Sequence, residues 1–347
     1  MNKLILSAFA CAFAIGTASA QNHNNEAIVK QQDSGNETYI EQVGATNRAV
    51  VGQGDHHGFS ILDEGTSLRN AARQAQSGTS NLALVHQGTD GAEARDNSAT
   101  QQQNGASNYA SIDQGTFNFA GPGLAQNNTA EQTQDGTENY ATVFQGTFDG
   151  DSRDNAAAQS QTGDMNYASI LQGTDEGTAE GNAAELAQEG AGHEASILQG
   201  VDMSESRDNT AAQTQAGELN VAYVEQGVAE GRASGNVAGQ HQDGLGNKAD
   251  IAQGLQGGDA RRNTALQSQL GEDNVAIINQ GLAGSLATDN VAEQRQEGAG
   301  HMALIHQGND GAPARDNRAL QVQSGTGHFS HVSQGGQGHT AEIRQSN

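Results

Sequence analysis

Residues 128–146 read NTAEQTQDGTENYATVFQG, and this stretch decides the fold. Each half keeps one kind of residue at every second position: Asn, Ala, Gln and Gln in the first half, and Asn, Ala, Val and Gln in the second. The alternating positions are Asn128, Ala130, Gln132, Gln134, Asn139, Ala141, Val143 and Gln145. An alternation of two is the period of a β-strand, whereas a helix would scatter these positions around its axis. The stretch therefore predicts two strands joined by a short turn.

The same pattern recurs along the chain at a nearly fixed interval. The Asn that opens each first half returns every 27 residues, with one step of 31, at Asn70, Asn97, Asn128, Asn155, Asn182, Asn209, Asn236, Asn263, Asn290 and Asn317. The longer step lies over 116–127, which holds Pro122, and Pro313 lies in the corresponding stretch of a later copy. Self-similarity at such a period is typical of solenoids. We expect ten repeats over 70–335, divergent half-repeats over 21–69 (the last of them degenerate, at Gly58–Glu64) and one half-repeat over 336–347.

Two kinds of connection join the expected strands. The turn inside each repeat has four residues and always carries a glycine at the same place, where a tight reversal requires positive φ. These glycines include Gly78, Gly105, Gly136, Gly163 and Gly190. The connections between repeats, such as 88–96 and 146–154, are longer and concentrate Asp, Glu, Gly and Arg. We therefore expect them to be solvated loops.

The composition fits a narrow interior built from carboxamides. The chain has 16 Lys+Arg against 41 Asp+Glu, a net charge of −25, only 34% hydrophobic residues, and 39 Gln and 29 Asn. So little apolar surface excludes an ordinary large globular enzyme, and so acidic a chain repels nucleic-acid phosphates. If the repeats stack in register, each inward amide donates to its copy in the next rung and accepts from the one before. The predicted fold is an all-β parallel β-solenoid of strand–turn–strand rungs with Asn/Gln ladders.

The acidic residues fit the same fold, because they fall at outward positions and in loops, with Glu64 as the main exception. The ladder positions predicted to carry self-assembly are Asn97, Gln103, Asn108, Gln114, Asn128, Gln134, Asn139, Gln145, Asn155, Gln161, Asn166, Gln172, Asn263, Gln269, Asn274 and Gln280. The terminal stacking surfaces are expected at Asn25 and Gln31 at one end, and at Ala341, Ile343 and Gln345 at the other. No capping segment is recognisable at either end, and open strand edges template further pairing. We therefore expect the chain to stack head-to-tail with copies of itself into an amyloid fibre.

Residues 1–20 have the features of a secretory signal peptide. Lys3 supplies the positive start, residues 4–15 are mostly apolar, and Ala18-Ser19-Ala20 is a small-residue cleavage site. The one cysteine, Cys11, lies inside this segment. The predicted mature chain is exported, has no disulfide or thiolate metal site, and contains no transmembrane segment.

The repeated string N-x-A-x-x-x-Q-x-G-x-x-N-x-A-x-x-x-Q, read at 97–114 and 155–172, resembles the curlin repeat of curli fibre subunits. The resemblance covers Asn70–Gly335 in ten copies, with partial copies on both sides. It implies a secreted bacterial β-solenoid that polymerises into functional amyloid on the cell surface, for biofilm matrix and adhesion. It also implies export through an outer-membrane channel and nucleation by a minor subunit. Whether this chain would be the major or the nucleating subunit stays open, because only Gln21–Asn24 corresponds to the family's secretion segment.

The sequence is also compatible with functions other than fibre formation. A monomeric secreted solenoid could serve as an adhesin, or the acidic loops, such as 90–96, could bind calcium, although their spacing does not match the known nonapeptide. A solenoid enzyme would need a break in the repeat that gathers acids and bases, and the break at 116–127 holds none. We therefore expect neither catalysis nor a cofactor.

Two further sets of residues stand out. Histidines replace the ladder Asn, in what we take to be second halves, at His193, His301, His328 and His339. The position after each second-half Asn is mostly apolar and predicts an outward stripe, formed by Leu82, Tyr109, Tyr140, Tyr167, Glu194, Val221, Lys248, Val275, Met302 and Phe329. The histidines fit either as hydrogen-bonding substitutes for Asn or as metal ligands, and the stripe fits either β-propensity or lateral contact between fibres.

Overall fold

The computed structural model describes residues 3–8, 15–21, 24–54, 66–89, 91–116, 123–309 and 311–347. The chain divides into two compact units, Met1–Glu180 and Gly181–Asn347. All regular elements in the described ranges are β-strands, and no helix occurs among them. The prediction of an all-β chain is confirmed.

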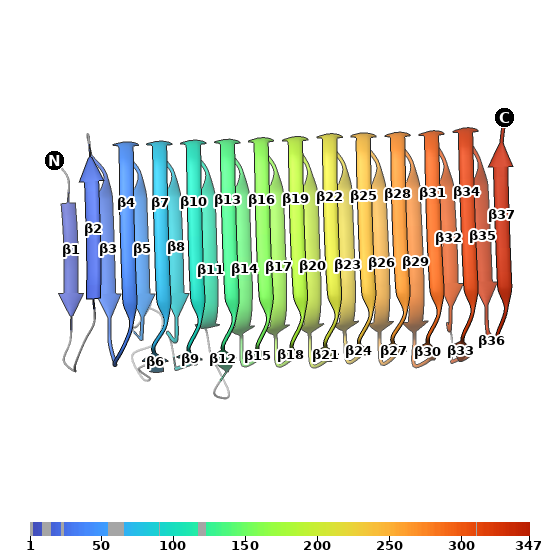
Figure 1. Cartoon of the computed structure of the whole chain (residues 1–347), viewed down its shortest axis with the longest axis horizontal. Coiled ribbons are helices and arrows are strands. Elements are labelled where there is room, and N and C mark those ends of the chain that lie inside the picture. Colours follow the sequence, from blue (N-terminus) through green and yellow to red (C-terminus); the bar gives the residue numbers. More distant parts are fainter. Residues whose placement is uncertain are drawn as a thin grey trace. The chain divides into compact units, whose positions relative to one another are not determined.

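In each unit the strands form three parallel sheets, which we name the first-half sheet, the second-half sheet and the loop sheet (Figure 1). In the first unit the first-half sheet contains β2 (Ile15–Gln21), β4 (Glu37–Ala45), β7 (Ala71–Thr79), β10 (Ser98–Ala106), β13 (Thr129–Thr137) and β16 (Ala156–Asp164). Its second-half sheet contains β1 (Lys3–Ala8), β3 (Glu26–Gln31), β5 (Arg48–Gln53), β8 (Leu82–Gln87), β11 (Tyr109–Thr116), β14 (Tyr140–Thr147) and β17 (Tyr167–Thr174). Its loop sheet contains β6 (Thr66–Leu68), β9 (Glu93–Arg95), β12 (Leu124–Gln126), β15 (Asp151–Arg153) and β18 (Thr178–Glu180).

The second unit repeats this arrangement. Its first-half sheet contains β19 (Ala183–Ala191), β22 (Thr210–Glu218), β25 (Val237–Leu245), β28 (Thr264–Glu272), β31 (Val291–Ala299), β34 (Arg318–Thr326) and β37 (Thr340–Ser346). Its second-half sheet contains β20 (Glu194–Val201), β23 (Val221–Val228), β26 (Lys248–Leu255), β29 (Val275–Leu282), β32 (Met302–Gln307) and β35 (Phe329–Gln334). Its loop sheet contains β21 (Glu205–Arg207), β24 (Arg232–Ser234), β27 (Asp259–Arg261), β30 (Leu286–Thr288), β33 (Ala314–Arg315) and β36 (Gly336–Gln337).

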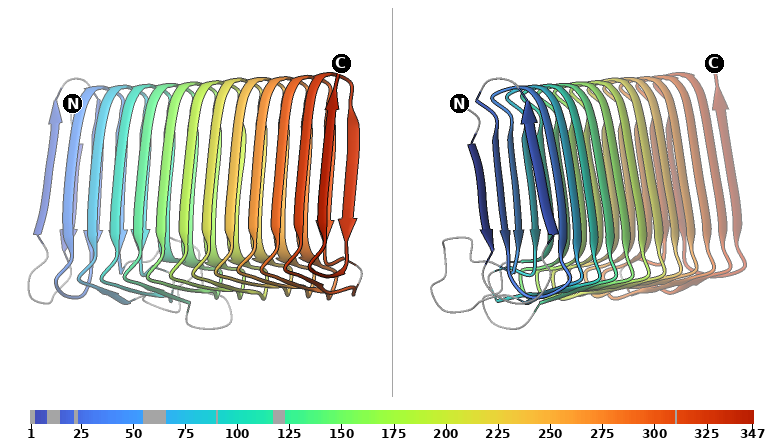
Figure 2. Two further views of the ribbon diagram at one scale, coloured as in Figure 1. Left: turned by 45° about the vertical axis from the view of Figure 1, so that its right-hand side comes forward. Right: turned by 60° about the vertical axis from the view of Figure 1, so that its left-hand side comes forward.

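The chain coils through the three sheets in turn, so that one repeat forms one rung (Figure 2). Neighbouring rungs pair in the register set by the repeat: Gln103 lies beside Gln134 in the first-half sheet, and Gln242 lies beside Gln269. The four extra residues before Asn128 do not disturb this register, because β12 still pairs with β9 and β15. The predicted solenoid with identical residues stacked in columns is therefore confirmed.

The alternation along each strand separates the interior from the surface. On β13, Ala130, Gln132 and Gln134 are buried, whereas Glu131 between them is exposed. On β14, Ala141, Val143 and Gln145 are almost completely buried. Small Ala side chains and one Val or Ile per rung fill the space between the facing strands. A thin interior of this kind needs little hydrophobic mass, as the composition indicated.

The turn glycines have the conformation that was predicted, and the structure adds a second reason for them. Gly136 and Gly271 adopt φ of +135° and +117°. A Cβ placed on Gly136 would overlap the carbonyl oxygen of Gly163 in the next rung, and a Cβ on Gly271 would overlap that of Gly298. Stacked turns therefore require glycine for backbone conformation and for the close approach of the next backbone.

The loop sheet was not predicted. The connections between repeats were expected to be solvated loops, and this is wrong for their central residues, which form short parallel strands such as β9 and β12. The middle residue of each of these strands is small and buried, for example Ala94, Ala125 and Ser152. A recurrent Ala or Ser three residues before the first-half Asn was the sequence signal that could have revealed it.

Residues 1–20, predicted to be a signal peptide, contain β1 and all but the last residue of β2. In the structure β1 pairs with β3 and β2 pairs with β4. Cleavage after Ala20 stays a prediction, and it would leave β3 and β4 as edge strands. The degenerate half-repeat with Glu64 and the proline at Pro122 lie outside the described residues.

Candidate self-assembly interface

Three columns of glutamine run through the interior of the rungs. In the column of Gln76, Gln103 and Gln134, each Nε2 donates to the Oε1 of the next rung at 2.8–2.9 Å. The column of Gln114 and Gln145 has the same bond at 2.8 Å. In the second unit, Gln242, Gln269 and Gln296 continue the pattern at 2.8–2.9 Å. The predicted glutamine ladders are confirmed.

In most rungs the second N–H of the amide also has a partner. Gln103 donates to the carbonyl oxygen of Leu82 on the facing strand at 3.0 Å, and Gln269 donates to that of Lys248 at 2.9 Å. These bonds tie the first-half sheet to the second-half sheet across the interior. A buried polar group without a partner costs about 1–3 kcal/mol, and the double use of Nε2 avoids that cost for the N–H groups of these amides.

The asparagine columns make the predicted side-chain bonds between rungs, such as Asn236 Nδ2 to Asn209 Oδ1 and Asn274 Nδ2 to Asn247 Oδ1 at 3.0 Å, and the structure adds bonds to the backbone that were not predicted. The side-chain Oδ1 of Asn97 accepts the backbone N–H of Asn128 at 2.8 Å, and Nδ2 of Asn97 donates to the carbonyl oxygen of Ala125 at 2.8 Å. In second halves, Nδ2 of Asn108 donates to Gly136 O at 2.9 Å and only weakly to Asn81 Oδ1 at 3.2 Å. Asparagine therefore joins each rung mainly to the backbone of the next, because its shorter side chain stands at the corner, where the strand begins.

A left-handed residue precedes these asparagines and explains their place at the corners. Glu138, Asp154 and Leu219 have φ of 57°, 55° and 57° and immediately precede Asn139, Asn155 and Asn220. The reversal of the chain at this point exposes backbone N–H and C=O groups that the Asn side chain binds. Sequence reasoning missed these residues because their identities vary.

The predicted ladder residues are all buried in these columns. They are Asn97, Gln103, Asn108, Gln114, Asn128, Gln134, Asn139, Gln145, Asn155, Gln161, Asn166, Gln172, Asn263, Gln269, Asn274 and Gln280. Of the predicted terminal residues, Asn25 and Gln31 are buried as well, whereas Ala341, Ile343 and Gln345 on β37 are half-buried. β37 pairs with β34 alone, and β35 pairs with β32 alone, among the described strands.

The hydrogen bonds of every glutamine column point the same way. Nε2 belongs to the earlier rung and Oε1 to the later one, from Gln31 and Gln53 at 2.6 Å to Gln323 and Gln345 at 2.9 Å. A column therefore begins with an acceptor and ends with a donor. Gln42 Oε1 and Gln74 Oε1 are buried without a hydrogen-bond partner. Gln74 lacks a donor because its neighbour in the preceding rung is Ile40.

Apolar residues interrupt one column. Ile40, Leu186 and Ile343 occupy positions where other rungs have the first Gln of the first half. Gln213 Oε1, which follows Leu186 in register, is another buried oxygen without a partner. In the first unit two glutamine columns begin at Gln31 and Gln42 and the third begins after Ile40, whereas in the second unit two columns end at Gln334 and Gln345 and the third ends before Ile343.

The histidines take the place of asparagine and make the same kind of hydrogen bond to the backbone of the next rung. His193 Nδ1 accepts the backbone N–H of Asn220 at 3.2 Å, and burial lowers the pKa of His193. His301 and His328 stack with ring centroids 5.2 Å apart. The prediction for His339 needs a correction: its N–H donates to Asn317 Oδ1 at 2.7 Å, so it belongs to a first-half column. An 11-residue half-repeat separates His328 from His339, and half-repeats alternate between sheets.

Among the described residues, no group of three or more His, Cys, Asp or Glu could hold a metal ion.

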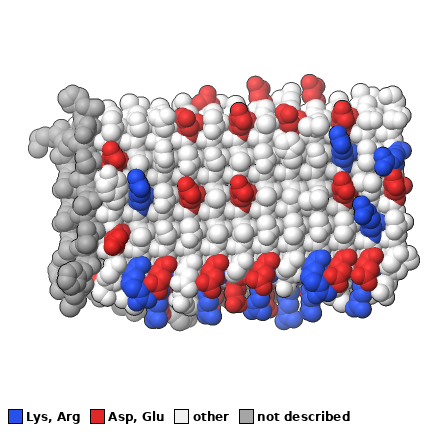
Figure 3. Space-filling model, viewed as in Figure 1, with Lys and Arg blue, Asp and Glu red and all other residues white. Residues whose placement is uncertain are grey.

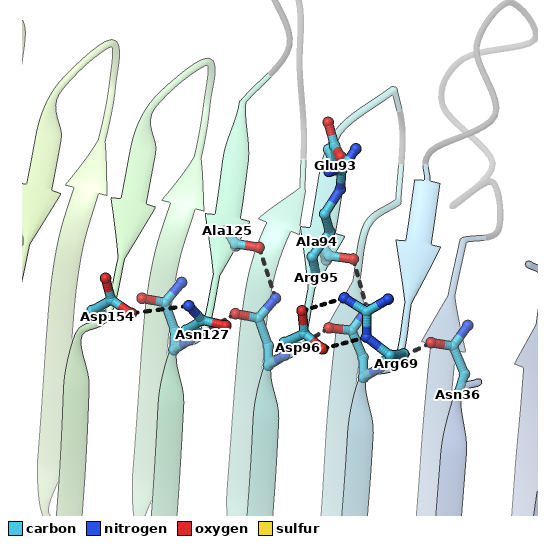
Figure 4. A network of polar contacts seen from close by, with 12 residues as sticks. Asn36, Arg69, Glu93, Ala94, Arg95, Asp96, Ala125, Asn127 and Asp154 are labelled. Atoms are coloured by element: carbon cyan, nitrogen blue, oxygen red, sulfur yellow. Dashed lines mark hydrogen bonds and ion pairs between the residues drawn. The ribbon is translucent and has the colours of Figure 1, made fainter. Parts of the chain in front are cut away.

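Charged side chains lie outside the interior. In Figure 3, Lys, Arg, Asp and Glu gather along the lower edge of the described part of the face shown, Asp and Glu also line its upper edge, and several charged side chains lie between the two edges. Close to the loop sheet, Arg69 binds Asp96 in the next rung through two bonds of 2.6 Å, which lowers the pKa of Asp96 (Figure 4). Asn127 donates to Asp154 at 3.0 Å in the same way. Such exposed pairs contribute little stability, typically less than about 1 kcal/mol.

One outward acid differs from this pattern. Asp113 on β11 is only 4% exposed, and its Oδ1 lies 2.6 Å from His86 Nδ1 on β8. Ser111 donates to the other carboxylate oxygen at 3.0 Å. Sequence reasoning expected outward acids to be solvated, and it missed this pair because His86 and Asp113 become neighbours only through the stacking of rungs.

The predicted outward stripe forms a column on the second-half sheet. Tyr109, Tyr140 and Tyr167 stack with ring centroids 4.5 Å and 5.1 Å apart. Partial burial raises the pKa of Tyr109 to about 12. In the second unit the stripe residues Met302 and Phe329 are 38% and 59% exposed.

Comparison with known proteins finds no match among protein-family models and none among curated proteins. In the part of the chain that the structure describes, no helix is long and apolar enough to cross a membrane.

Proposed function

We propose that the chain is a structural subunit that stacks head-to-tail with copies of itself into an extracellular fibre of the curli type. The observation that carries the proposal is the direction of the glutamine columns. In one of these columns Gln345 accepts from Gln323 and its Nε2 donates once, to Phe329 O, whereas Gln42 donates to Gln76 and its buried Oε1 has no partner, so the two ends are complementary. A second copy satisfies both ends when it adds rungs in the same direction.

The remaining parts of the proposal rest on the sequence. The predicted signal peptide supports export, and removing residues 1–20 would uncover β3 and β4. The resemblance to the curlin repeat supports a role in biofilm matrix and adhesion, with a nucleating subunit and an outer-membrane channel as partners. The acidic outer surface supports solubility of the subunit before assembly.

The direct test uses the chain from Gln21 to Asn347. We expect negative-stain microscopy of an incubated sample to show unbranched fibres. Diffraction from an aligned pellet should give a reflection of about 4.8 Å along the fibre axis. A sample that stays as single particles would contradict the proposal and would favour a monomeric adhesin.

A matched pair of variants isolates the terminal donor. Gln345→Glu replaces the last donating amide of its column with a carboxylate that would face Gln42 Oε1 across the junction. Ser346→Asp adds the same charge on the outward neighbour. We expect Gln345→Glu to slow fibre growth at least tenfold and Ser346→Asp to change it less than twofold, with both subunits retaining their circular dichroism spectrum. Equal effects of the two variants would count against a junction made by the glutamine columns.

A further inference from the structure

The asparagine columns define what each rung presents to the next one at its corners. In the second unit, Asn220 Oδ1 accepts the backbone N–H of Asn247 at 2.9 Å, and Asn247 Oδ1 accepts that of Asn274 at 3.1 Å. Every rung therefore offers a side-chain acceptor to the backbone N–H of the rung that follows it. The bond requires an acceptor without a proton at this position.

Histidine fills this position with its Nδ1 atom. His301 Nδ1 accepts the N–H of His328 at 3.1 Å, as His193 Nδ1 does for Asn220. The Nε2 atoms of His193, His301 and His328 lie 3.0–3.2 Å from backbone carbonyl oxygens four residues earlier in the chain. Nε2 therefore donates and Nδ1 accepts, which assigns the neutral imidazole with its proton on Nε2.

His328 is the last member of its column in the structure. Its ring is parallel to that of His301 within 2°, and its Nε2 has the corresponding carbonyl partner, Ser324 O, at 3.0 Å. Nδ1 of His328 therefore points along the column, away from β32 and toward the open edge of β35. It takes the place that Asn Oδ1 has in the other rungs.

Continuing the columns fixes what would meet this edge. In register, β3 of the next copy lies on β35, with Gln31 beside Gln334, and β4 lies on β37, with Gln42 beside Gln345. This register puts Ile40 beside Ile343, which pairs the two apolar interruptions of the first glutamine column. It also brings the backbone N–H of Asn25, which stands in the same column as Asn47 and Asn81, to Nδ1 of His328.

Resting on the proposed function, we propose that His328 makes the junction between copies proton-gated: a neutral imidazole accepts the Asn25 N–H of the next copy, and a protonated one blocks its addition. Protonation places an N–H at Nδ1 opposite another N–H. It also leaves a positive charge to be buried between two rungs, which is costly without a partner. Imidazole is the side chain whose ordinary charge change lies between pH 5 and 8, so the test compares two pH values within that interval.

The other ionisable groups at the junction do not provide the same switch. Behind His328 stands His301, which is buried in both states of the junction, and the turn residues Ser324 and Thr326 are neutral. Exposed His331 and His339 share the edge. The remaining charged groups near it are Asp316, Arg318, Glu342 and Arg344 on this copy and Glu26, Lys30, Glu37 and Glu41 on the next. Apart from Glu26, which is half-buried, these charged side chains are exposed, and none of them stands in the corner column of His328.

The test measures seeded fibre growth of the chain from Gln21 at pH 5.5 and 7.5. We expect the wild type to elongate at least tenfold more slowly at pH 5.5, and His328→Asn, which restores the usual residue of the column, to bring this ratio below threefold. His241→Asn removes an exposed outward imidazole and His339→Asn removes the other histidine at a corner of this edge. Both variants should still elongate at least about threefold more slowly at pH 5.5 than at pH 7.5. Circular dichroism at both pH values verifies that the subunits remain folded.

Each result decides the proposal. A wild-type ratio near one, or an unchanged tenfold ratio in His328→Asn, overturns the gate while the proposed function stands. A ratio abolished by His339→Asn instead assigns the gate to the other column and overturns the role of His328. Absence of fibres from every variant at both pH values overturns the proposed function and the gate together.

Discussion

The interior columns and the loop sheet follow the same 27-residue period, but they constrain the sequence differently. In the interior, Gln103 binds Gln76 on one side and Gln134 on the other, so a glutamine makes all its column bonds only when both neighbouring rungs also have glutamine. In the loop sheet the strands pair through the backbone, and the residues in register vary: Glu93 lies beside Leu124, and Leu124 lies beside Asp151. Side-chain hydrogen bonding along a column preserves residue identity, whereas backbone pairing preserves only the small buried residue in the middle.

The largest loss of stability is expected from substitution of a turn glycine. Gly271→Ala places a Cβ against the Gly298 carbonyl oxygen and also strains a residue at φ +117°. We expect it to lower the free energy of unfolding by roughly 3–5 kcal/mol or to prevent folding of the second unit. Gly284 in a loop has φ +72° with nothing within 4 Å of a Cβ, so Gly284→Ala should cost about 1 kcal/mol. Urea unfolding followed by circular dichroism measures both, and similar losses would contradict the close-approach argument.

The next prediction compares the same substitution, Gln to Leu, in an interior glutamine column and in the loop sheet. Gln103→Leu removes two donated bonds and one accepted bond and leaves Gln76 Nε2 and Gln134 Oε1 without their partners. We expect a loss of about 2–4 kcal/mol from thermal or urea unfolding. Gln126→Leu makes the same change in β12 of the loop sheet, at a position that is only partly buried. It should change stability by less than about 0.5 kcal/mol.

The smallest effect on stability is expected from an acidic side chain on the outward face of the second-half sheet. Burial raises the pKa of Asp250, and burial together with the Asp250 charge raises that of Glu225. Asp250 Oδ1 is buried without a hydrogen-bond partner. Because the folded state takes up this proton at a higher pH than the unfolded state, wild-type stability rises as pH falls through the raised pKa toward the ordinary value.

Replacing this carboxylate removes that contribution. We expect Asp250→Asn to be more stable than wild type at neutral pH by about 1 kcal/mol. The difference should shrink as pH falls toward 4, when thermal unfolding is followed from pH 7 downward. A variant that is less stable than wild type at neutral pH would show that the charge of Asp250 is useful in the folded state.

The columns could be predicted from sequence because a period of two and a period of 27 act on the same residues. Asn128, Gln134 and Gly136 recur together, and their burial and conformation follow from in-register stacking. The loop sheet was harder to predict, since its strands have three residues or fewer and share only a buried Ala or Ser. The bonding of asparagine to backbone depends on corner geometry, which a residue pattern does not specify. The buried pair of His86 and Asp113 occurs in one place only and has no period to reveal it.

The same reasoning explains what the sequence indicated about the ends of the array. It placed Gln345 and Gln31 at opposite edges, but the direction of the columns, with donors at one edge and acceptors at the other, appears only when side-chain bonds are known. That direction turns two open edges into a complementary pair. It also explains why Ile40 and Ile343, which look like defects inside the repeat, would meet each other in one register.

The measurement that tests this account most directly is a cross-link between copies. In the predicted register Arg344 lies beside Glu41, both outward, at a Cα separation of about 4.8 Å that a disulfide can span. The chain from Gln21 has no cysteine, so Arg344→Cys with Glu41→Cys introduces the only thiols. We predict that mild oxidation of its fibres gives a reducible ladder of covalent multimers, and that Arg344→Cys with Glu37→Cys, four residues out of register, gives none. Multimers from both pairs, or from neither, would contradict a solenoid whose amide columns continue from one molecule into the next.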